Sequence, residues 1–121
     1  MGISVVYDFP PFDTGLFEEA IFSMARGDAE LVVLVAERDD IVLRFKRARW
    51  HEFTAQYNCT PDQINTAYFK LVEIDGSSSV ANYVAADKAG AKAYRELHHY
   101  RVFLDEHGCH ELFAESVDAS R

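Results

Sequence analysis

Residues 97–117 read Leu-His-His-Tyr-Arg-Val-Phe-Leu-Asp-Glu-His-Gly-Cys-His-Glu-Leu-Phe-Ala-Glu-Ser-Val, and this stretch indicates the fold most clearly. Two β-rich runs, Leu97–Asp105 and Cys109–Val117, flank the loop Glu106-His107-Gly108. A three-residue loop that ends in glycine is typical of a type I turn followed by a bulge, because the last position needs a positive φ. This register pairs Asp105 with Cys109 and leaves one mainly apolar and one mixed face. We therefore expect a half-buried C-terminal β-hairpin.

A second hairpin is expected upstream of it. The apolar run Leu31–Ala36 and the alternating run Ile41–Phe45 flank four polar residues, Glu37–Asp40. The first run is apolar on both sides, as in a central strand. The second places Val42 and Arg44 on one face, which we expect to be solvated.

Residues 15–26 predict a helix. Apolar side chains recur at helical spacing from Leu16 to Ala25, Glu18 and Glu19 lie in the first turn, and Gly27 supplies a stop. The same letters also fit a buried strand.

The segment Asn58–Gln63 carries the best local signal. Thr60 at the N-cap, Pro61 at the first helical position and Gln63 three residues after the cap form a capping box, so we expect a short helix at about residues 61–69. Other expected elements are strands at residues 3–9, 50–54 and 71–74, a third short helix near residues 79–86 that is capped by Ser77–Ser79, and a surface connection over residues 87–96.

Short connections between strands favour antiparallel pairing, since parallel strands need long crossovers. We expect an α+β fold with an antiparallel or mixed sheet, two or three short helices and a C-terminal β-hairpin. The length of 121 residues predicts one globular domain over residues 1–121.

The charge is strongly acidic. The chain has 20 Asp and Glu against 12 Lys and Arg, a net charge of −8. Residues 44–50 carry four bases and no acid, so the rest of the chain has a net charge of −12. The electrostatic field of this negative charge repels nucleic acid and attracts cationic partners. No apolar run is long enough to cross a bilayer and no secretory signal is visible, so we expect a cytoplasmic protein with a protein partner, no nucleic acid and no membrane association.

The basic segment and a few nearby polar groups form a speculative binding set. Trp50 follows the bases closely, and exposed aromatic and arginine side chains are favoured at interfaces. The simpler interpretation of the segment is a strand whose arginines lie near neighbouring carboxylates. The set consists of Arg44, Lys46, Arg47, Arg49, Trp50, His51, Cys59 and His99.

Four histidines and one cysteine crowd into residues 98–110, which is the composition of a metal site. In the expected register, however, Cys109 and His110 project to opposite faces, and so do His98 and His99. Only His107 and Cys109 could then share an ion. We therefore expect no metal and no cofactor, with His99 paired to Glu115.

No catalytic motif is present. Cys59 precedes the expected helix at residues 61–69, whose N-terminus lowers a thiol pKa, and His51 is the nearest base in sequence. A buried structural cysteine is the simpler interpretation. No carboxylate pair, phosphate loop or nucleophile elbow has a recognisable spacing, so the sequence supports no catalytic residue.

Residues 99–116, His-Tyr-Arg-Val-Phe-Leu-Asp-Glu-His-Gly-Cys-His-Glu-Leu-Phe-Ala-Glu-Ser, resemble a segment of small uncharacterised bacterial proteins. Some of these look like immunity partners of polymorphic toxins, and Asp40–Phe45 echoes them more loosely. The resemblance implies a small, acidic, cytosolic protein that occludes the active site of a toxin. It transfers no functional residue.

Two functions follow as hypotheses. The first is a non-catalytic, immunity-like interaction protein that binds a protein partner through an acidic surface or an exposed strand edge. The alternative is a small-molecule-binding or hydrolytic domain with a pocket between the sheet and its helices.

Overall fold

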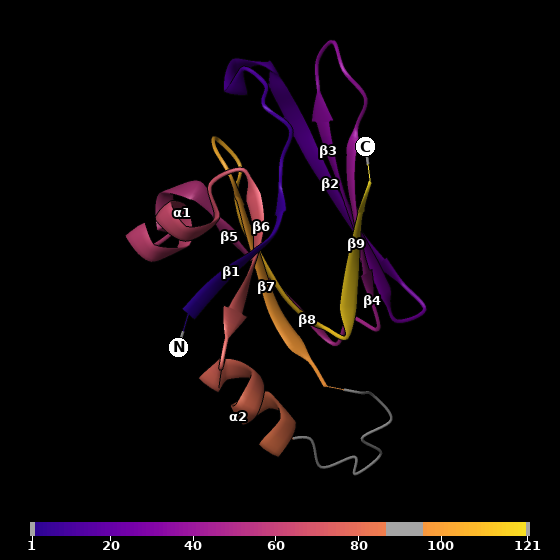
Figure 1. The fold of residues 1–121 in the computed structure, drawn as a ribbon, viewed down its shortest axis with the longest axis vertical. Helices are drawn as coiled ribbons and strands as arrows, with labels where there is room; N and C mark the ends of the chain where they lie inside the picture. Colours follow the sequence, from indigo (N-terminus) through magenta and orange to yellow (C-terminus); the bar gives the residue numbers. More distant parts are fainter. Residues whose placement is uncertain (1, 87–95, 121) are drawn as a thin grey trace.

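A computed structural model describes residues 2–86 and 96–120, and these form two antiparallel β-sheets with two short α-helices (Figure 1). The five-stranded sheet has the order β1-β6-β7-β8-β5, and the four-stranded sheet has the order β2-β3-β4-β9. The elements are β1 (Gly2–Asp8), a 3-10 turn (Thr14–Leu16), β2 (Phe17–Ala25), β3 (Asp28–Val35), β4 (Ile41–Lys46), β5 (Trp50–Ala55), a second 3-10 turn (Gln56–Asn58), α1 (Pro61–Ala67), β6 (Lys70–Asp75), α2 (Ser78–Ala86), β7 (His98–Leu104), β8 (Gly108–Ala114) and β9 (Ser116–Ser120).

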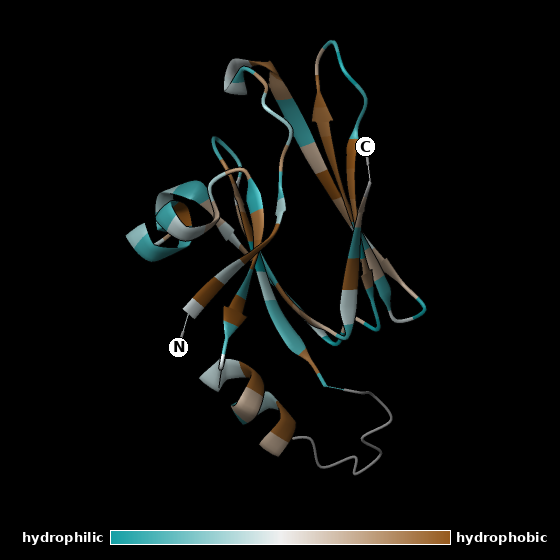
Figure 2. Cartoon of the chain, viewed as in Figure 1, coloured by the Kyte–Doolittle hydropathy of each residue, from teal (hydrophilic) through white to brown (hydrophobic). Residues whose placement is uncertain are grey.

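The main core lies between the two sheets. Leu31 and Val33 of β3 and Leu43 of β4 are fully buried with Val102 of β7 and Leu112 of β8. Figure 2 shows the hydrophobic residues along β3 that supply one side of this core. Alternation along β4 is strict, because Ile41, Leu43 and Phe45 are buried while Arg44 and Lys46 are exposed. The structure confirms the expected hairpin, which β3 and β4 form, and the solvent-exposed face of its second strand.

A smaller core lies on the opposite face of the five-stranded sheet, beneath α1. Phe103 and Cys109 from the sheet pack there with Ala67 of α1 and with Val72 and Ile74 of β6. Figure 1 shows α1 on the side of this sheet that faces away from the four-stranded sheet, and α2 at one end. Strands β7 and β8 are therefore buried on both faces, and not on one as the sequence predicted.

The capping box at α1 is confirmed. The Gln63 backbone N–H donates to Thr60 Oγ1 at 3.1 Å, and the Thr60 N–H donates to Gln63 Oε1 at 2.9 Å. Both contacts are local, so the sequence alone was sufficient to predict them. The helix at Ser78–Ala86 and the strands at residues 50–55 and 70–75 also match the expected ones. The expected connection over residues 87–96 lies outside the described residues, apart from the exposed Glu96.

The helix predicted at residues 15–26 is wrong. This segment forms β2, which pairs with β3 from Phe17–Val35 to Ala25–Asp28. Arg26 and Gly27 have φ values of 56° and 85°, so they form the two-residue turn of a hairpin and Gly27 does not end a helix. The apolar β3 requires a partner on each side, and this non-local pairing overrides the helical spacing.

The predicted register of the C-terminal hairpin is wrong by two residues. Phe103 pairs with Cys109 and Leu104 with Gly108, so the loop is residues 105–107 and the left-handed position is Glu106, with a φ of 64°. A shift of two keeps every side chain on its expected face. Gly108 has the positive φ that the sequence predicts, 148°, and glycine is needed there for a second reason: a Cβ would lie 2.2 Å from the carbonyl oxygen of Thr54 on β5.

The second strand of that hairpin is also shorter than expected. It ends at Ala114, and after Glu115 the chain continues as β9, which pairs with β4 in the other sheet. The fold is thus broadly α+β, as expected, but it is mostly β and contains two sheets.

Candidate functional site

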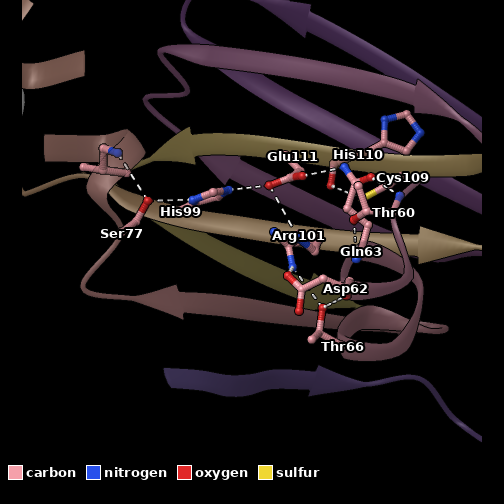
Figure 3. A network of polar contacts seen from close by, with 11 residues as sticks. Thr60, Asp62, Gln63, Thr66, Ser77, His99, Arg101, Cys109, His110 and Glu111 are labelled. Carbon is pink, nitrogen blue, oxygen red and sulfur yellow. Dashed lines mark hydrogen bonds and ion pairs between the residues drawn. The ribbon is translucent and has the colours of Figure 1, made fainter. Parts of the chain in front are cut away.

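Glu111 is the only buried carboxylate among the described residues, and it organises the outer face of β7 and β8 (Figure 3). His99 Nε2 lies 2.5 Å from Glu111 Oε1, and Gln63 Nε2 donates to Glu111 Oε2 at 2.8 Å. Arg101 Nε makes an ion pair with Oε1 at 3.4 Å. Burial alone would raise the pKa of Glu111, but the hydrogen bonds from His99 and Gln63 and the charge of Arg101 outweigh it and lower the pKa below its usual value.

The same network fixes α1 to the sheet. Arg101 Nη1 donates to Asp62 Oδ2 at 3.1 Å and to Thr66 Oγ1 at 3.0 Å, one helical turn apart on α1. Gln63, which closes the capping box with its oxygen, uses its amide nitrogen to bind Glu111. The local motif that starts the helix therefore also docks it.

A chain of contacts extends from Glu111 to α2. Ser77 Oγ lies 2.8 Å from His99 Nδ1, and the Val80 N–H donates to the same oxygen at 3.2 Å. With the Nε2 proton directed at Glu111, Nδ1 of His99 accepts a hydrogen bond from the Ser77 hydroxyl. The order hydroxyl, imidazole, carboxylate is that of a nucleophile, its base and the group that orients the base.

Next to this chain lies an open pocket of about 570 Å³ between α2 and the start of β7. His98 Nδ1 lies 2.7 Å from Glu73 Oε2 at its wall. The polar lining residues are Glu73, Ser77, Ser78, Glu96, His98 and His99, and the apolar ones include Ile74, Val84 and Leu97.

Three histidines meet on the inner face of the five-stranded sheet. His110 Nδ1 lies 3.0 Å from His51 Nε2, and His110 Nε2 lies 2.8 Å from His107 Nε2. The His51 ring stacks on Phe22 of the other sheet with a centroid separation of 3.7 Å. We call His51, His110 and His107 the histidine chain. It joins the two sheets where β5, the edge strand of one sheet, lies against β2, the edge strand of the other.

Burial keeps the histidine chain neutral. Desolvation, followed by the charges of His107 and His51, lowers the pKa of His110 to about 3. Burial also lowers the pKa of His51. For His107, burial lowers the pKa and the nearby Glu19 carboxylate offsets part of that effect. Neutral rings suit the chain because each has one N–H to donate.

The structure separates the eight residues predicted for binding. Arg44 and Lys46 lie on the exposed face of β4, where Arg44 Nε contacts Glu30 Oε2 at 3.1 Å, and Arg47 Nε lies 3.6 Å from Glu115 Oε2. Arg49 is exposed just before β5.

Trp50 and His99 share one aromatic neighbour. The Trp50 ring stacks on Phe113 at 4.3 Å, and His99 meets the edge of the same ring at 5.2 Å. His51 points to the opposite face of the sheet, into the histidine chain.

Cys59 and His51 do not form a nucleophile and base pair. The Cys59 thiol donates to the Thr54 carbonyl oxygen at 3.3 Å, while His51 contacts His110. Burial raises the pKa of Cys59 and also that of Cys109. Both thiols therefore stay protonated near neutral pH.

The expected contacts of the C-terminal histidines need correction. His99 lies opposite Phe113 and contacts Glu111, where Glu115 was expected. His107 approaches His110 and not Cys109, which packs beneath α1. The opposite orientation of Cys109 and His110 is confirmed. Over residues 2–86 and 96–120, no group of three or more His, Cys, Asp or Glu side chains could hold a metal ion.

Sequence reasoning missed two connected sets: Ser77, Gln63, Arg101 and Glu111, which form one network with His99, and the contacts of His110 with His51 and His107 on the opposite face. One signal was available for two of them: Arg101 and Glu111 are charged residues on the face that α1 covers. The correct register pairs them directly, whereas the predicted register placed Arg101 opposite Phe113.

No protein-family model, curated protein or solved structure matches this chain. None of the described helices is long and apolar enough to cross a bilayer.

The histidine chain predicts a loss of stability in mild acid. The folded-state pKa of His110, about 3, lies below the unfolded value near 6.5, so the unfolded chain binds more protons as the pH falls. Its contribution is complete above pH 6.5 and is lost progressively towards pH 3. Between pH 7.5 and pH 5 the loss from His110 is about 2 kcal/mol. Urea denaturation of wild type and His110→Gln at both pH values should show a smaller pH effect in the variant, and equal pH effects would contradict this account.

Proposed function

We propose that this chain is a non-catalytic interaction protein of the immunity type, which binds a cationic protein partner through its acidic surface. The observation that carries the proposal is the charge: a net −12 outside residues 44–50. Apart from Glu111, the described carboxylates are exposed or half-buried, so their field acts on the solvent side. Electrostatic complementarity of this kind steers association and selects partners.

Two further points support this proposal. The thiol of Cys59, which the sequence offered as a nucleophile, has a raised pKa, as does that of Cys109. The described histidines of residues 98–110 are engaged in internal contacts. Residues 99–116 resemble a segment of small uncharacterised bacterial proteins, and those among them that look like immunity partners agree with an inhibitor that occludes a toxin. Because this segment is largely buried, it would stabilise the fold, and the partner would bind elsewhere.

The test is direct binding to the product of the gene adjacent to this one in its native genome. We expect a complex whose association rate falls at least about tenfold between about 50 and 500 mM NaCl. Neutralising the exposed loop acids in a Glu37→Gln/Asp39→Asn/Asp40→Asn variant should slow association about threefold. The exposed, uncharged Asn65→Ala serves as the matched control and should not change the rate. The proposal fails if no complex forms at low salt or if the rate is independent of salt.

The pocket beside α2 favours a second candidate function, hydrolysis of a small ester. There the Ser77 hydroxyl would attack the carbonyl carbon and pass its proton to His99 Nδ1, while Glu111 stabilises the imidazolium. As the ester C–O bond breaks, the imidazolium would return this proton to the departing alcohol, and water would then hydrolyse the acyl-serine. The pocket is large enough for a drug-sized ligand. Against this role, Ser77 already accepts the cap hydrogen bond of α2, and His99 is only 7% exposed.

A fluorophosphonate probe separates the two functions. If the pocket is hydrolytic, the probe labels Ser77 in the wild type and its labelling rate falls at least about tenfold in His99→Gln. The neighbouring Ser78→Ala variant should label normally. Absence of a Ser77 adduct by mass spectrometry would eliminate the hydrolytic candidate and leave the interaction proposal intact.

A further inference from the structure

Strand β1 is a sheet edge with few features that would prevent another strand from pairing with it. It pairs only with β6, and within the described part of the chain no strand pairs with its other side. Its sequence, Gly-Ile-Ser-Val-Val-Tyr-Asp, holds no proline and no charge before Asp8. Ile3, Val5 and Val6 are 42%, 55% and 42% exposed. Natural sheets usually protect such an edge with charges, proline or a covering element.

The other three edges of the two sheets are better protected. Strand β2 carries Glu18 and Glu19, β5 carries Glu52, and β9 is a five-residue strand that contains Asp118. The edge formed by β2 and β5 is also joined by the stacking of Phe22 on His51. Within the part of the chain that the structure describes, β1 is protected by Asp8 at its end and by an irregularity between Val5 and Tyr7, which together leave a regular, uncharged ladder from Gly2 to Val5.

Carboxylates surround this apolar ladder. Asp75 pairs with Gly2 and accepts a hydrogen bond from the Ser4 hydroxyl at 2.6 Å, and Glu73 pairs with Ser4. At the far end Asp8 lies opposite Lys70. The neighbourhood thus holds three acids against one base, beside an unpaired row of backbone groups.

We propose that β1 is the docking edge for the partner, which adds an extended, lysine- or arginine-flanked strand to the five-stranded sheet; this rests on the proposed interaction function. Backbone hydrogen bonds to β1 would supply affinity, and the carboxylates of Asp8, Glu73 and Asp75 would select a strand that is flanked by lysine or arginine. A second copy of this chain fits poorly. Antiparallel pairing of β1 with itself around Val5 brings Asp8 of each copy to the Gly2–Asp75 end of the other, and it joins two chains of charge −8.

The test uses a fluorescent peptide, Lys-Lys-Val-Thr-Val-Thr-Val-Lys-Lys, and a counterpart with glutamate in place of lysine. We expect the lysine peptide to bind the full chain at least tenfold more tightly than the glutamate peptide. Hydrogen exchange should show new protection at amides of Gly2–Val5 when the lysine peptide binds. Val5→Lys, a change at a half-exposed position, should weaken peptide binding at least tenfold, while the matched Ile21→Lys on the β2 edge should leave it within twofold.

Four results would overturn the assignment: no binding of the lysine peptide, equal binding of both peptides, unchanged affinity of Val5→Lys, or protection at another edge. Sedimentation of the free protein as a dimer with β1 already protected would assign the edge to a second copy. Far-ultraviolet circular dichroism confirms that each variant is folded. A wild-type complex with the natural partner that Val5→Lys leaves unchanged would refute the docking edge alone, because the interaction function would still hold.

Discussion

A carboxylate buried between a sheet and a helix must be compensated by hydrogen bonds and opposite charge, and Glu111 imposes this requirement on the outer half of the molecule. Its hydrogen bonds come from His99 of β7 and Gln63 of α1, and its ion pair comes from Arg101 of β7. Arg101 also binds Asp62 of α1, and His99 also contacts Ser77, which caps α2. Removing one member would leave a charge uncompensated, which is more costly than losing one surface ion pair. The position of both helices therefore depends on one side chain of β8.

The inner face of β8 carries another buried polar residue, His110, which imposes a different requirement on the half of the molecule where the two sheets meet. His110 is next to Glu111 in sequence but points between the sheets, where burial favours the neutral ring and neighbouring imidazoles supply both hydrogen bonds. Strand β8 thus connects helices on one side and the second sheet on the other, and the chain then enters that second sheet as β9. The polar side chains of His110 and Glu111 on this strand therefore contribute to the packing of the fold.

Local signals in the sequence were reliable where the structure they specify forms within one segment, and they failed where pairing with another segment decides it. The capping box at Thr60 and the alternation along β4 depend on neighbours in sequence or on one face of one strand, and both could be predicted. Residues 15–26 became β2 because of pairing with β3, which periodicity within the segment cannot reveal. Gly108 has the predicted positive φ, but it is the first residue of β8 and not the end of the loop, because Glu106 also takes a positive φ; the register therefore could not be read from the glycine alone. Glu111 and the residues that contact it come from three separate segments, β8, β7 and α1, so only the charged pair Arg101 and Glu111 could have been recognised beforehand.

The central claim is that the Glu111 network holds α1 and α2 against the five-stranded sheet. Native-state hydrogen exchange on Glu111→Gln tests it most directly, because the exchange rates report the opening of each element separately. The account predicts that the amides of α1 that follow Pro61 and those of the first turn of Ser78–Ala86 lose protection together, while those of β3 and β4 keep theirs. Protection that is unchanged in both helices, or lost equally in every strand, would contradict it.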